Sequence, residues 1–337
     1  MTDSHKAFRP VRIVSTGRYE PSLIVTAAEI DAALGLEAGW TEKHTGVRER
    51  RVEKQLTCAE MGARAAKQAL ERAKLSIKDI DLVINASASF DQPIPCGAVL
   101  MLEQLGGNHG AMAFDINSTC ASFLVALDTA SAMLTAGGRV RRVLIVSSEK
   151  PNTSMNPKHP ESYALFGDVS AACILERDES GRSQILATRM EAYPEGRALC
   201  EMRAGGMTKP PSRWDEHEHD DKYFDMKGPA LVKMSLKKLP GFVERLYAQG
   251  TGFTTPDLDW LVPHQASLPA LEIVRRVLNV APERYVITAD RFGNNVAASL
   301  PLALDEIAST GKLSRGQSVL LLGTAAGFSM AGVLLKY

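Results

Sequence analysis

The chain has 337 residues, of which 45% are hydrophobic and 23% are charged, and its 39 acidic and 39 basic residues cancel to a formal net charge of zero. A balanced charge argues against binding to nucleic acid or to an anionic membrane by general electrostatic attraction. The length suits two domains or one duplicated domain, and it allows a large buried core without disulfides or a structural metal.

The N-terminus and the cysteines indicate a cytoplasmic protein. The first residues, MTDSHKAFRP, lack the apolar stretch of a signal peptide. The five cysteines are odd in number and irregularly spaced, which favours reduced thiols. The charge-free segment 318–335 is long enough for a membrane span, but its three glycines predict two buried strands and a glycine-rich turn instead.

Two parts of the chain repeat one another. KDIDLVINASAS at 78–89 and PDLDWLVPHQAS at 256–267 each contain an Asp-x-Asp pair, an apolar strand and a small polar turn. Further on, residues 113–134 and 286–307 each predict a short strand, a polar loop and a long apolar helix. Each helix ends near a glycine, and an apolar strand follows it.

These repeats predict an α/β protein in which one βαβ-rich unit is used twice. Strands alternate with helices, so we expect mainly parallel sheets covered by helices. The expected halves are residues 1–178 and 179–337. The second half contains an insertion at about 191–226 that is rich in proline, glycine and charge, which predicts a long loop beside a binding site.

Cys120 is the candidate nucleophile. It lies in DINSTCASF, directly before a predicted helix. A helix N-terminus favours anions, so it lowers the pKa of a thiol and promotes the reactive thiolate. A single cysteine is more often a buried core residue, so the motif alone leaves both interpretations open.

His264 and Asn294 become candidates through the repeat. Alone, a histidine after an apolar strand is more often structural, and an asparagine after a glycine usually belongs to a turn. The repeat makes the Cys120 and Asn294 loops structural counterparts, which brings them together. A thiol, an imidazole and an amide that converge form a nucleophilic site of the triad type.

Seven motifs in order along the chain carry a resemblance to a known family. They are GWTEKHTGVRERR (39–51), MGARAAKQALERA (61–73), FDINSTCASF (114–123), LFGDVSAACIL (165–175), VPHQAS (262–267), DRFGNNVAASLPLALDEI (290–307) and GTAAGFSMAGVLLKY (323–337). The chain resembles β-ketoacyl-acyl-carrier-protein synthase III, in the Cys–His–Asn branch of the thiolase superfamily. The similarity covers nearly the whole chain.

This resemblance implies a five-layer αβαβα fold and an enzyme that forms carbon–carbon bonds. Cys120 would take an acyl group from acyl-coenzyme A, with the backbone N–H groups of Cys120 and Ala326 binding the oxyanion. A malonyl thioester, on coenzyme A or on a carrier protein, would then lose carbon dioxide while His264 and Asn294 stabilise the enolate. The family also implies a homodimer, no metal and no permanently bound cofactor, because coenzyme A or phosphopantetheine arrives with the substrates.

Further positions match family residues that handle the substrates. They are Trp40 for the adenine of coenzyme A, Thr45 in the same motif, Gly228 on the pantetheine tunnel, Ser267 beside the catalytic histidine, and Ile94 at the end of the acyl pocket, in some members across the dimer interface. Lys233, Arg275 and Arg276 fall where the family keeps basic residues for docking the carrier protein. For Arg50 and Arg51 we expect a solvated face or ion pairs at a dimer edge.

Several family positions differ in this chain. The family's FGDGAGA is FGDVSAA here, so two glycines are replaced near Val169 and Ser170. Ser267 replaces an asparagine, and Pro160 and Pro269 replace arginines at the substrate entrance. These changes spare the reaction centre, so they predict a specialised enzyme that uses a primer other than acetyl or serves secondary metabolism. The alternatives are an acyltransferase that passes the acyl group to a hydroxyl or amine without condensation, and a non-catalytic partner subunit.

An acidic, histidine-containing run, DEHEHDD at 215–221, is the candidate for a metal site. Its residues fall in a predicted loop and lack the spacing of a defined ligand set. We therefore expect a solvated loop and no metal.

Overall fold

The computed structural model describes residues 8–213 and 220–337. The first half contains β1 (Val11–Tyr19), β2 (Leu23–Thr26), α1 (Ala27–Leu34), α2 (Trp40–Thr45), β3 (Glu49–Val52), α3 (Cys58–Ala73), β4 (Leu82–Asn85), α4 (Gly97–Gln104), β5 (Met112–Asp115), α5 (Ser122–Thr135), β6 (Arg142–Glu149), α6 (Pro160–Tyr163) and β7 (Val169–Arg177). The second half contains β8 (Gln184–Ala192), β9 (Cys200–Glu201), β10 (Asp225–Met226), α7 (Gly228–Tyr247), β11 (Trp260–Pro263), α8 (Leu268–Val277), α9 (Ala289–Phe292), α10 (Ser299–Ser309), β12 (Ser318–Ala325) and β13 (Ser329–Lys336).

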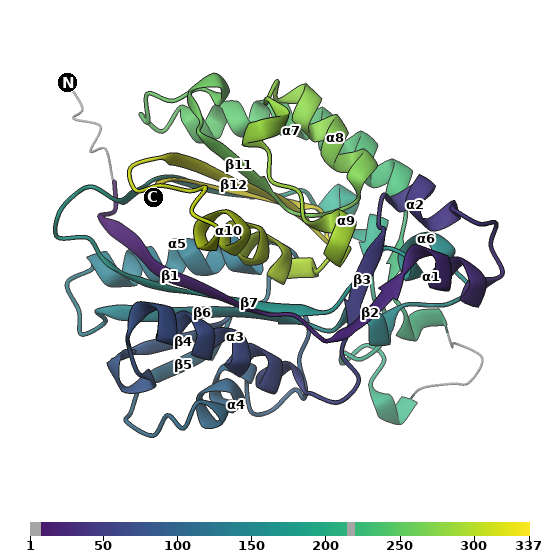
Figure 1. Ribbon diagram of the computed structural model, residues 1–337, viewed down its shortest axis with the longest axis horizontal. Coiled ribbons are helices and arrows are strands. Elements are labelled where there is room, and N and C mark those ends of the chain that lie inside the picture. The colour runs from purple at the N-terminus through teal and green to yellow at the C-terminus, as the bar shows by residue number, and fades with distance from the viewer. Residues whose placement is uncertain (1–7, 214–219) are drawn as a thin grey trace.

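These elements stack in five layers, α-β-α-β-α (Figure 1). Helices α3 and α4 cover the outer face of the first sheet, and α7 and α8 cover the outer face of the second. Helices α5 and α10 lie between the two sheets. The α/β fold with five layers that the sequence predicted is confirmed.

The two large sheets share one topology. Among the described residues, the first sheet has the strand order β1-β7-β6-β4-β5 and the second has the order β8-β13-β12-β11. Strands β1 and β8 each pair antiparallel with the last strand of their half. In the second sheet, a parallel bridge between Leu261 and Tyr285 stands at the position that corresponds to β5. The duplication is therefore present in the backbone.

The sheets are mixed, so the expectation of mainly parallel sheets was wrong. The pairs β4–β5, β4–β6 and β11–β12 are parallel, whereas β6–β7, β7–β1, β12–β13 and β13–β8 are antiparallel. Three residues, 326–328, join β12 to β13. That connection is too short for the crossover that a parallel pair requires.

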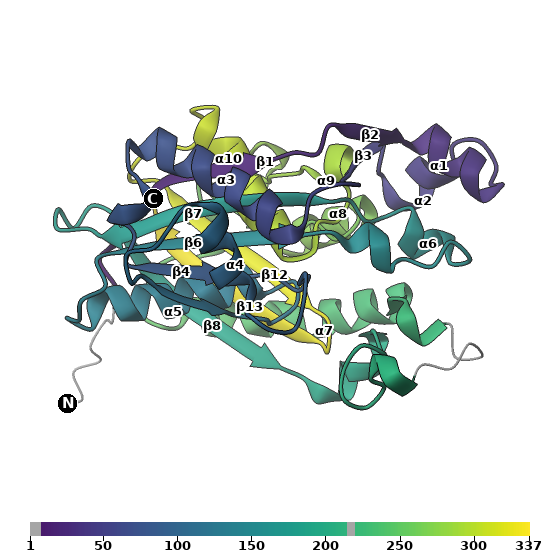
Figure 2. The same ribbon diagram turned by 90° about the horizontal axis from the view of Figure 1, so that it is seen from below.

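The charge-free segment 318–335 is the β12–β13 hairpin, as the glycines predicted. In the described part of the chain, no helix combines the length and the apolar character that crossing a bilayer requires. The segment 191–226 contains the short antiparallel pair β9–β10 near the start of α7. Figure 2 shows β2, α1, α2 and β3 forming an extension at the end of the molecule that also holds α6.

The central layer is almost wholly apolar. Phe123 and Leu127 of α5 and Leu300 and Leu304 of α10 are fully buried in one cluster with both sheets. Burying a side chain of this size stabilises the fold by about 1.5–3 kcal/mol. The loops that precede these two helices, which carry Cys120 and Asn294, are therefore held at fixed positions.

A buried carboxylate connects the central layer to the first half. Asp305 of α10 is fully buried and accepts a hydrogen bond from Thr16 Oγ1 of β1 at 2.6 Å and one from Arg72 of α3 at 2.5 Å. A buried carboxylate is stable only where hydrogen bonds and cations compensate for its lost hydration. Asp305 thus fixes α10 against β1 and α3.

We expect Asp305→Ala to lower the free energy of unfolding by about 3 kcal/mol, because Thr16 and Arg72 lose a buried partner. Urea denaturation measures this change. The control is Glu179→Ala, which removes an exposed ion pair with Arg177 at 3.5 Å and should change stability by less than about 0.5 kcal/mol. Equal effects of the two substitutions would contradict the assignment.

Candidate active site

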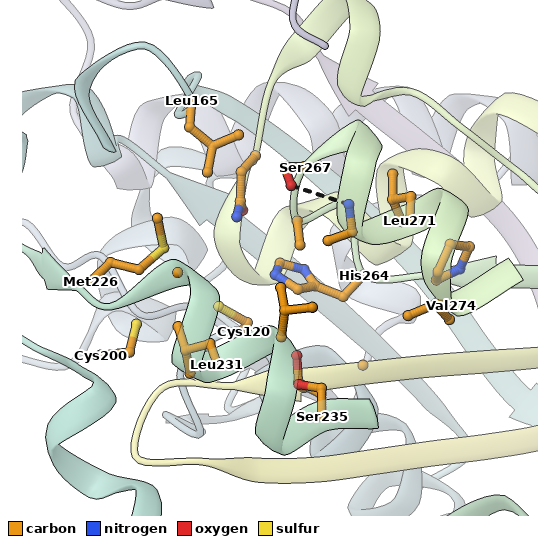
Figure 3. A pocket seen from close by; sticks show the side chains of 18 of the residues that line it. Cys120, Leu165, Cys200, Met226, Leu231, Ser235, His264, Ser267, Leu271 and Val274 are labelled. Carbon is orange, nitrogen blue, oxygen red and sulfur yellow. Dashed lines mark hydrogen bonds between the residues drawn. The ribbon is translucent and has the colours of Figure 1, made fainter. Parts of the chain in front are cut away.

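Cys120, His264 and Asn294 line one pocket of about 330 Å³. Cys120 comes from the turn before α5, His264 follows β11, and Asn294 lies in the loop before α10. Figure 3 shows Cys120 and His264 near the centre of the pocket. The structure therefore brings together the three residues that the sequence analysis selected.

The turn that carries Cys120 is built by local hydrogen bonds. Ser122 Oγ accepts from the backbone N–H of Ser118 at 2.9 Å and donates to Thr119 O at 2.6 Å. Thr119 has a φ of 50°, a left-handed conformation that is costly for a β-branched residue. Strain of this kind persists where the surrounding structure fixes the backbone, and here it lies directly before the candidate nucleophile.

The pKa of Cys120 shifts in the direction opposite to the one expected from the helix N-terminus. Burial raises the pKa of the Cys120 thiol to about 12, and the Glu149 carboxylate adds to the rise. The backbone N–H groups of Ala326 and Cys120 act in the other direction because they donate toward the sulfur. The expected lowering was wrong because loss of water outweighs the helix terminus in this pocket.

His264 is a neutral imidazole, and hydrogen bonds fix both its backbone and its ring. Its backbone N–H donates to Leu322 O at 2.7 Å, and its ring Nδ1 lies 2.7 Å from Ser299 Oγ. Burial lowers the pKa of His264 to about 4. The ring therefore carries no charge at neutral pH, because the protonated form would lose its hydration.

The amide of Asn294 has a defined orientation. Its Oδ1 accepts a hydrogen bond from the backbone N–H of Val296 at 2.9 Å. Since a backbone N–H can only donate, this bond identifies the oxygen end of the amide and leaves the Nδ2 donors for the pocket. Asn294 is also fixed by its own backbone, which pairs with Leu165 O at 2.9 Å and with Gly167 N at 3.1 Å.

Of the predicted substrate-binding residues, Thr45, Gly228 and Ser267 line the pocket. Ser267 begins α8 as its N-terminal cap, with its hydroxyl 3.4 Å from Ala270 N. Trp40 does not line the pocket, but it stacks on His44, which does, with ring centroids 4.3 Å apart. The α2 segment thus forms one edge of the pocket.

Ile94 does not line the pocket of its own chain. Its side chain is 84% exposed, and it lies in the segment between β4 and α4 that runs along the surface. Within one chain, Ile94 is therefore not part of the pocket. Its expected place at the end of the acyl pocket across a dimer interface stays a prediction.

The predicted docking residues differ in their surroundings. Lys233 is exposed on α7. Arg275 and Arg276 of α8 both pair with Glu272, at 2.8 and 2.6 Å. Because Glu272 compensates much of their charge, these two arginines present a weaker positive surface than the sequence suggested.

Arg50 corrects another expectation, because it is buried and not on a solvated face. Its guanidinium donates to Phe166 O at 2.8 Å and to Tyr163 O. Arg51 is partly buried, 3.9 Å from Glu20 and 3.8 Å from Glu49. Arg50 therefore holds the segment 163–166, which includes part of the pocket wall.

Three residues near the site were not found from the sequence. Ser299 bonds His264, Cys200 lines the pocket, and Glu149 is fully buried with its carboxylate accepting from Ala88 N at 2.7 Å and Ser89 N at 2.9 Å. Burial raises the pKa of Glu149 to about 7. Only the position of Ser299 at the start of the repeated helix offered a signal, because contacts across the two halves do not appear in a linear motif.

The described residues contain no group of three histidine, cysteine or carboxylate side chains placed to bind a metal. Most of the acidic run at 215–221 lies outside the described residues, which omit 214–219. Its last residue, Asp221, forms ion pairs with Arg203 and Lys209.

Comparison with known proteins identifies the family. Residues 114–194 match the family described as 3-oxoacyl-[acyl-carrier-protein] synthase III, and residues 248–337 match its C-terminal family. A β-ketoacyl-[acyl-carrier-protein] synthase III of Alkalilimnicola ehrlichii is 32% identical over 97% of this chain and 99% of its own length. The chain therefore belongs to the β-ketoacyl-acyl-carrier-protein synthase III family, and it is an acyltransferase that condenses acyl thioesters.

Solved structures agree with this assignment. The 3-oxoacyl-[acyl-carrier-protein] synthase III of Aquifex aeolicus has a TM-score of 0.88 and 30% identity, and the match covers 97% of this chain and all of that one. A priming β-ketosynthase of the R1128 polyketide pathway has a TM-score of 0.86 and 27% identity, with 98% and 97% of the two chains covered. The thiolase-type fold is thus shared along nearly the whole chain.

The high pKa of Cys120 predicts an unusual alkylation profile. We expect the rate of iodoacetamide labelling at Cys120 to keep rising from pH 7 to pH 10, because the thiolate fraction of a group with a pKa of about 12 grows about tenfold per pH unit over that range, whereas an ordinary cysteine levels off above about pH 8.5. Peptide mass spectrometry at each pH measures the rate.

The buried thiols of Cys58, Cys173 and Cys200 serve as internal controls, because burial raises their pKa values further still. They should label more slowly than Cys120, and an acyl-coenzyme A should protect Cys120. A labelling rate at Cys120 that levels off near pH 7 would show that its thiolate is stabilised in the free enzyme.

Proposed function

We propose that this enzyme joins an acyl group carried on Cys120 to a malonyl thioester with loss of carbon dioxide, giving a β-ketoacyl thioester. The observation that carries the proposal is the presence of two separate donor sets in one pocket. Backbone N–H groups of Cys120 and Ala326 point toward the sulfur, and the side chains of His264 and Asn294 line the same cavity. Condensation needs a second set of donors for an enolate, and His264 and Asn294 are available for it in the same pocket.

In the first step, the Cys120 sulfur attacks the carbonyl carbon of an acyl-coenzyme A. The carbonyl oxygen becomes an oxyanion bound by the N–H groups of Cys120 and Ala326. Collapse of this intermediate forms the Cys120 thioester and releases coenzyme A, which leaves with the proton that the thiol carried. Because the thiol pKa is high in the ligand-free pocket, binding of this oxyanion has to supply much of the lowering of the activation barrier.

In the second step, a malonyl thioester takes the place of coenzyme A. Its thioester oxygen accepts hydrogen bonds from His264 and Asn294, and the carboxylate leaves as carbon dioxide. The electron pair left behind is stabilised as an enolate, which attacks the acyl carbon and releases the Cys120 sulfur as a thiolate. The thiolate takes up a proton from solvent, which restores the thiol. Neutral donors in a pocket shielded from water are well suited to this charge, because they need no reorganisation when it forms.

We expect His264→Ala and Asn294→Ala to lower the condensation rate by about 100- to 1,000-fold, since each removes one donor to the enolate. Both variants should still load an acyl group on Cys120. Intact-protein mass spectrometry follows loading, and release of carbon dioxide from a malonyl thioester follows the second step.

Cys120→Ala is the control that should lose loading. A wild-type enzyme that acylates alcohols or amines but releases no carbon dioxide from any malonyl thioester would replace condensation with simple acyl transfer.

We also propose that the primer is an unbranched or branched alkyl acyl group longer than acetyl. The pocket wall near Cys120 is apolar: Leu165, Phe166, Cys200, Phe224 and Met226 line it. Figure 3 shows Cys200 and Met226 together on one side of Cys120. Each methylene that enters an apolar pocket contributes about 0.8 kcal/mol, or about fourfold in binding.

Loading rates for acetyl- through decanoyl-coenzyme A test the primer. We expect the loading rate to be highest for an acyl chain longer than two carbons. In Cys200→Phe we expect the highest rate to move back toward acetyl, because the larger side chain occupies space in the pocket. Met207→Phe is the matched control, because Met207 is 91% exposed and does not line the pocket. If the wild-type enzyme loaded acetyl fastest, the proposed preference for a longer primer would be refuted.

The proposed partners are acyl-coenzyme A, a malonyl thioester on coenzyme A or a carrier protein, and a second copy of the chain. Phe90 and Ile94, both in the segment between β4 and α4, are large apolar residues that are 57% and 84% exposed, which supports a homodimer that covers them. Light scattering tests this proposal, since a homodimer should have twice the 36.5 kDa mass of one chain.

A further inference from the structure

The side chain that hydrogen-bonds to the His264 ring is a serine. Ser299 is the first residue of α10 and is fully buried. Its Oγ lies 2.7 Å from Nδ1 of His264, 2.9 Å from Val296 O and 3.4 Å from Gln265 N. Three polar groups from two segments of the chain therefore meet at one hydroxyl.

The single proton of this hydroxyl links Ser299 to the tautomer of His264. Val296 O can only accept a hydrogen bond, and the Gln265 N–H can only donate one. The Ser299 proton therefore points either to Nδ1 of His264 or to Val296 O. In the first case the neutral ring carries its proton on Nε2, and in the second case it carries it on Nδ1.

We propose that Ser299 donates to Nδ1 of His264 and so holds the ring in the Nε2–H form. The inference rests on the proposed function, because only a proton on Nε2 can be donated to the thioester oxygen. The Nδ1···Oγ distance of 2.7 Å favours this direction, because bonds donated by a hydroxyl are usually shorter than the roughly 2.9 Å of a bond that a ring N–H would donate to oxygen. The Gln265 N–H then donates to a lone pair of the Ser299 oxygen. This contact does not use the Ser299 proton, which can therefore be donated to the His264 ring.

The same short turn orients both donors of the pocket. The Val296 N–H binds Oδ1 of Asn294 at 2.9 Å, which turns the Nδ2 group toward the substrate. Ser299, three residues later, sets which nitrogen of His264 bears the proton. Ser299 is thus a positioning residue: it does not line the pocket, and it acts through His264.

The wild-type protein itself provides the first test. Histidine labelled with ¹⁵N gives separate ring-nitrogen resonances for the two tautomers, and His264→Gln assigns the His264 signals among the seven histidines. At pH 7 we expect a protonated Nε2 and an unprotonated Nδ1. A protonated Nδ1 would overturn the proposal.

Ser299→Ala provides the second test. Without the hydroxyl, the His264 signals should shift toward a mixture of tautomers, and condensation should fall by roughly two- to tenfold, the bias that one neutral hydrogen bond supplies, while acyl loading changes less. Ser131→Ala is the matched control, because Ser131 is a buried helix serine with the same bond to a carbonyl three residues earlier, Asp128 O at 2.7 Å. It should leave the tautomer unchanged.

The outcomes separate this inference from the proposed function. An Nε2–H ring that is unaffected by Ser299→Ala would refute the role of Ser299 alone. A wild-type enzyme with the Nε2–H ring that releases no carbon dioxide from malonyl thioesters would refute condensation and leave the role of Ser299 intact.

Discussion

Burial of α5 and α10 between the two sheets is the constraint on which the rest of the structure depends. Apolar side chains of both helices pack tightly against the two sheets, so neither helix can shift without opening a cavity. The loop before α5 carries Cys120 and the loop before α10 carries Asn294. Asp305 fixes α10 against the first half. The geometry of the pocket is therefore a consequence of core packing more than of the loops themselves.

The same burial determines the chemistry. Removing water keeps His264 neutral and raises the pKa of Cys120, so the ligand-free pocket holds neither an imidazolium nor a thiolate. Charge appears only when a substrate places an oxygen among the fixed donors. A site of this kind stores its electrostatic stabilisation in the orientation of neutral groups, and this is why the contacts behind His264 and Asn294 matter as much as the residues themselves.

Sequence patterns predicted the duplication, the β12–β13 hairpin and the three residues that meet in the pocket, because repeats and glycine positions are local properties of the chain. Strand direction in the sheets was missed, since the short connection between β12 and β13 matters more than the alternation of strands and helices. The burial of Arg50, the exposure of Ile94 and the contact of Ser299 with His264 depend on how distant segments pack. The pKa of Cys120 could not be inferred from its helix because desolvation depends on the whole surrounding pocket.

Arg50 connects two parts of the pocket, the wall segment 163–167 and the loop that carries Asn294. These connected residues are called the frame below. Its guanidinium binds the carbonyls of Tyr163 and Phe166, and the backbone of Asn294 pairs with the same segment at Leu165 and Gly167. The Asn294 backbone and this part of the pocket wall are therefore both connected to one buried cation. For protein engineering, this divides the lining into two classes. Side chains outside the frame, such as Leu231 and Met226, can be exchanged to admit other acyl groups, whereas exchanges within 163–167 would displace the amide along with the wall.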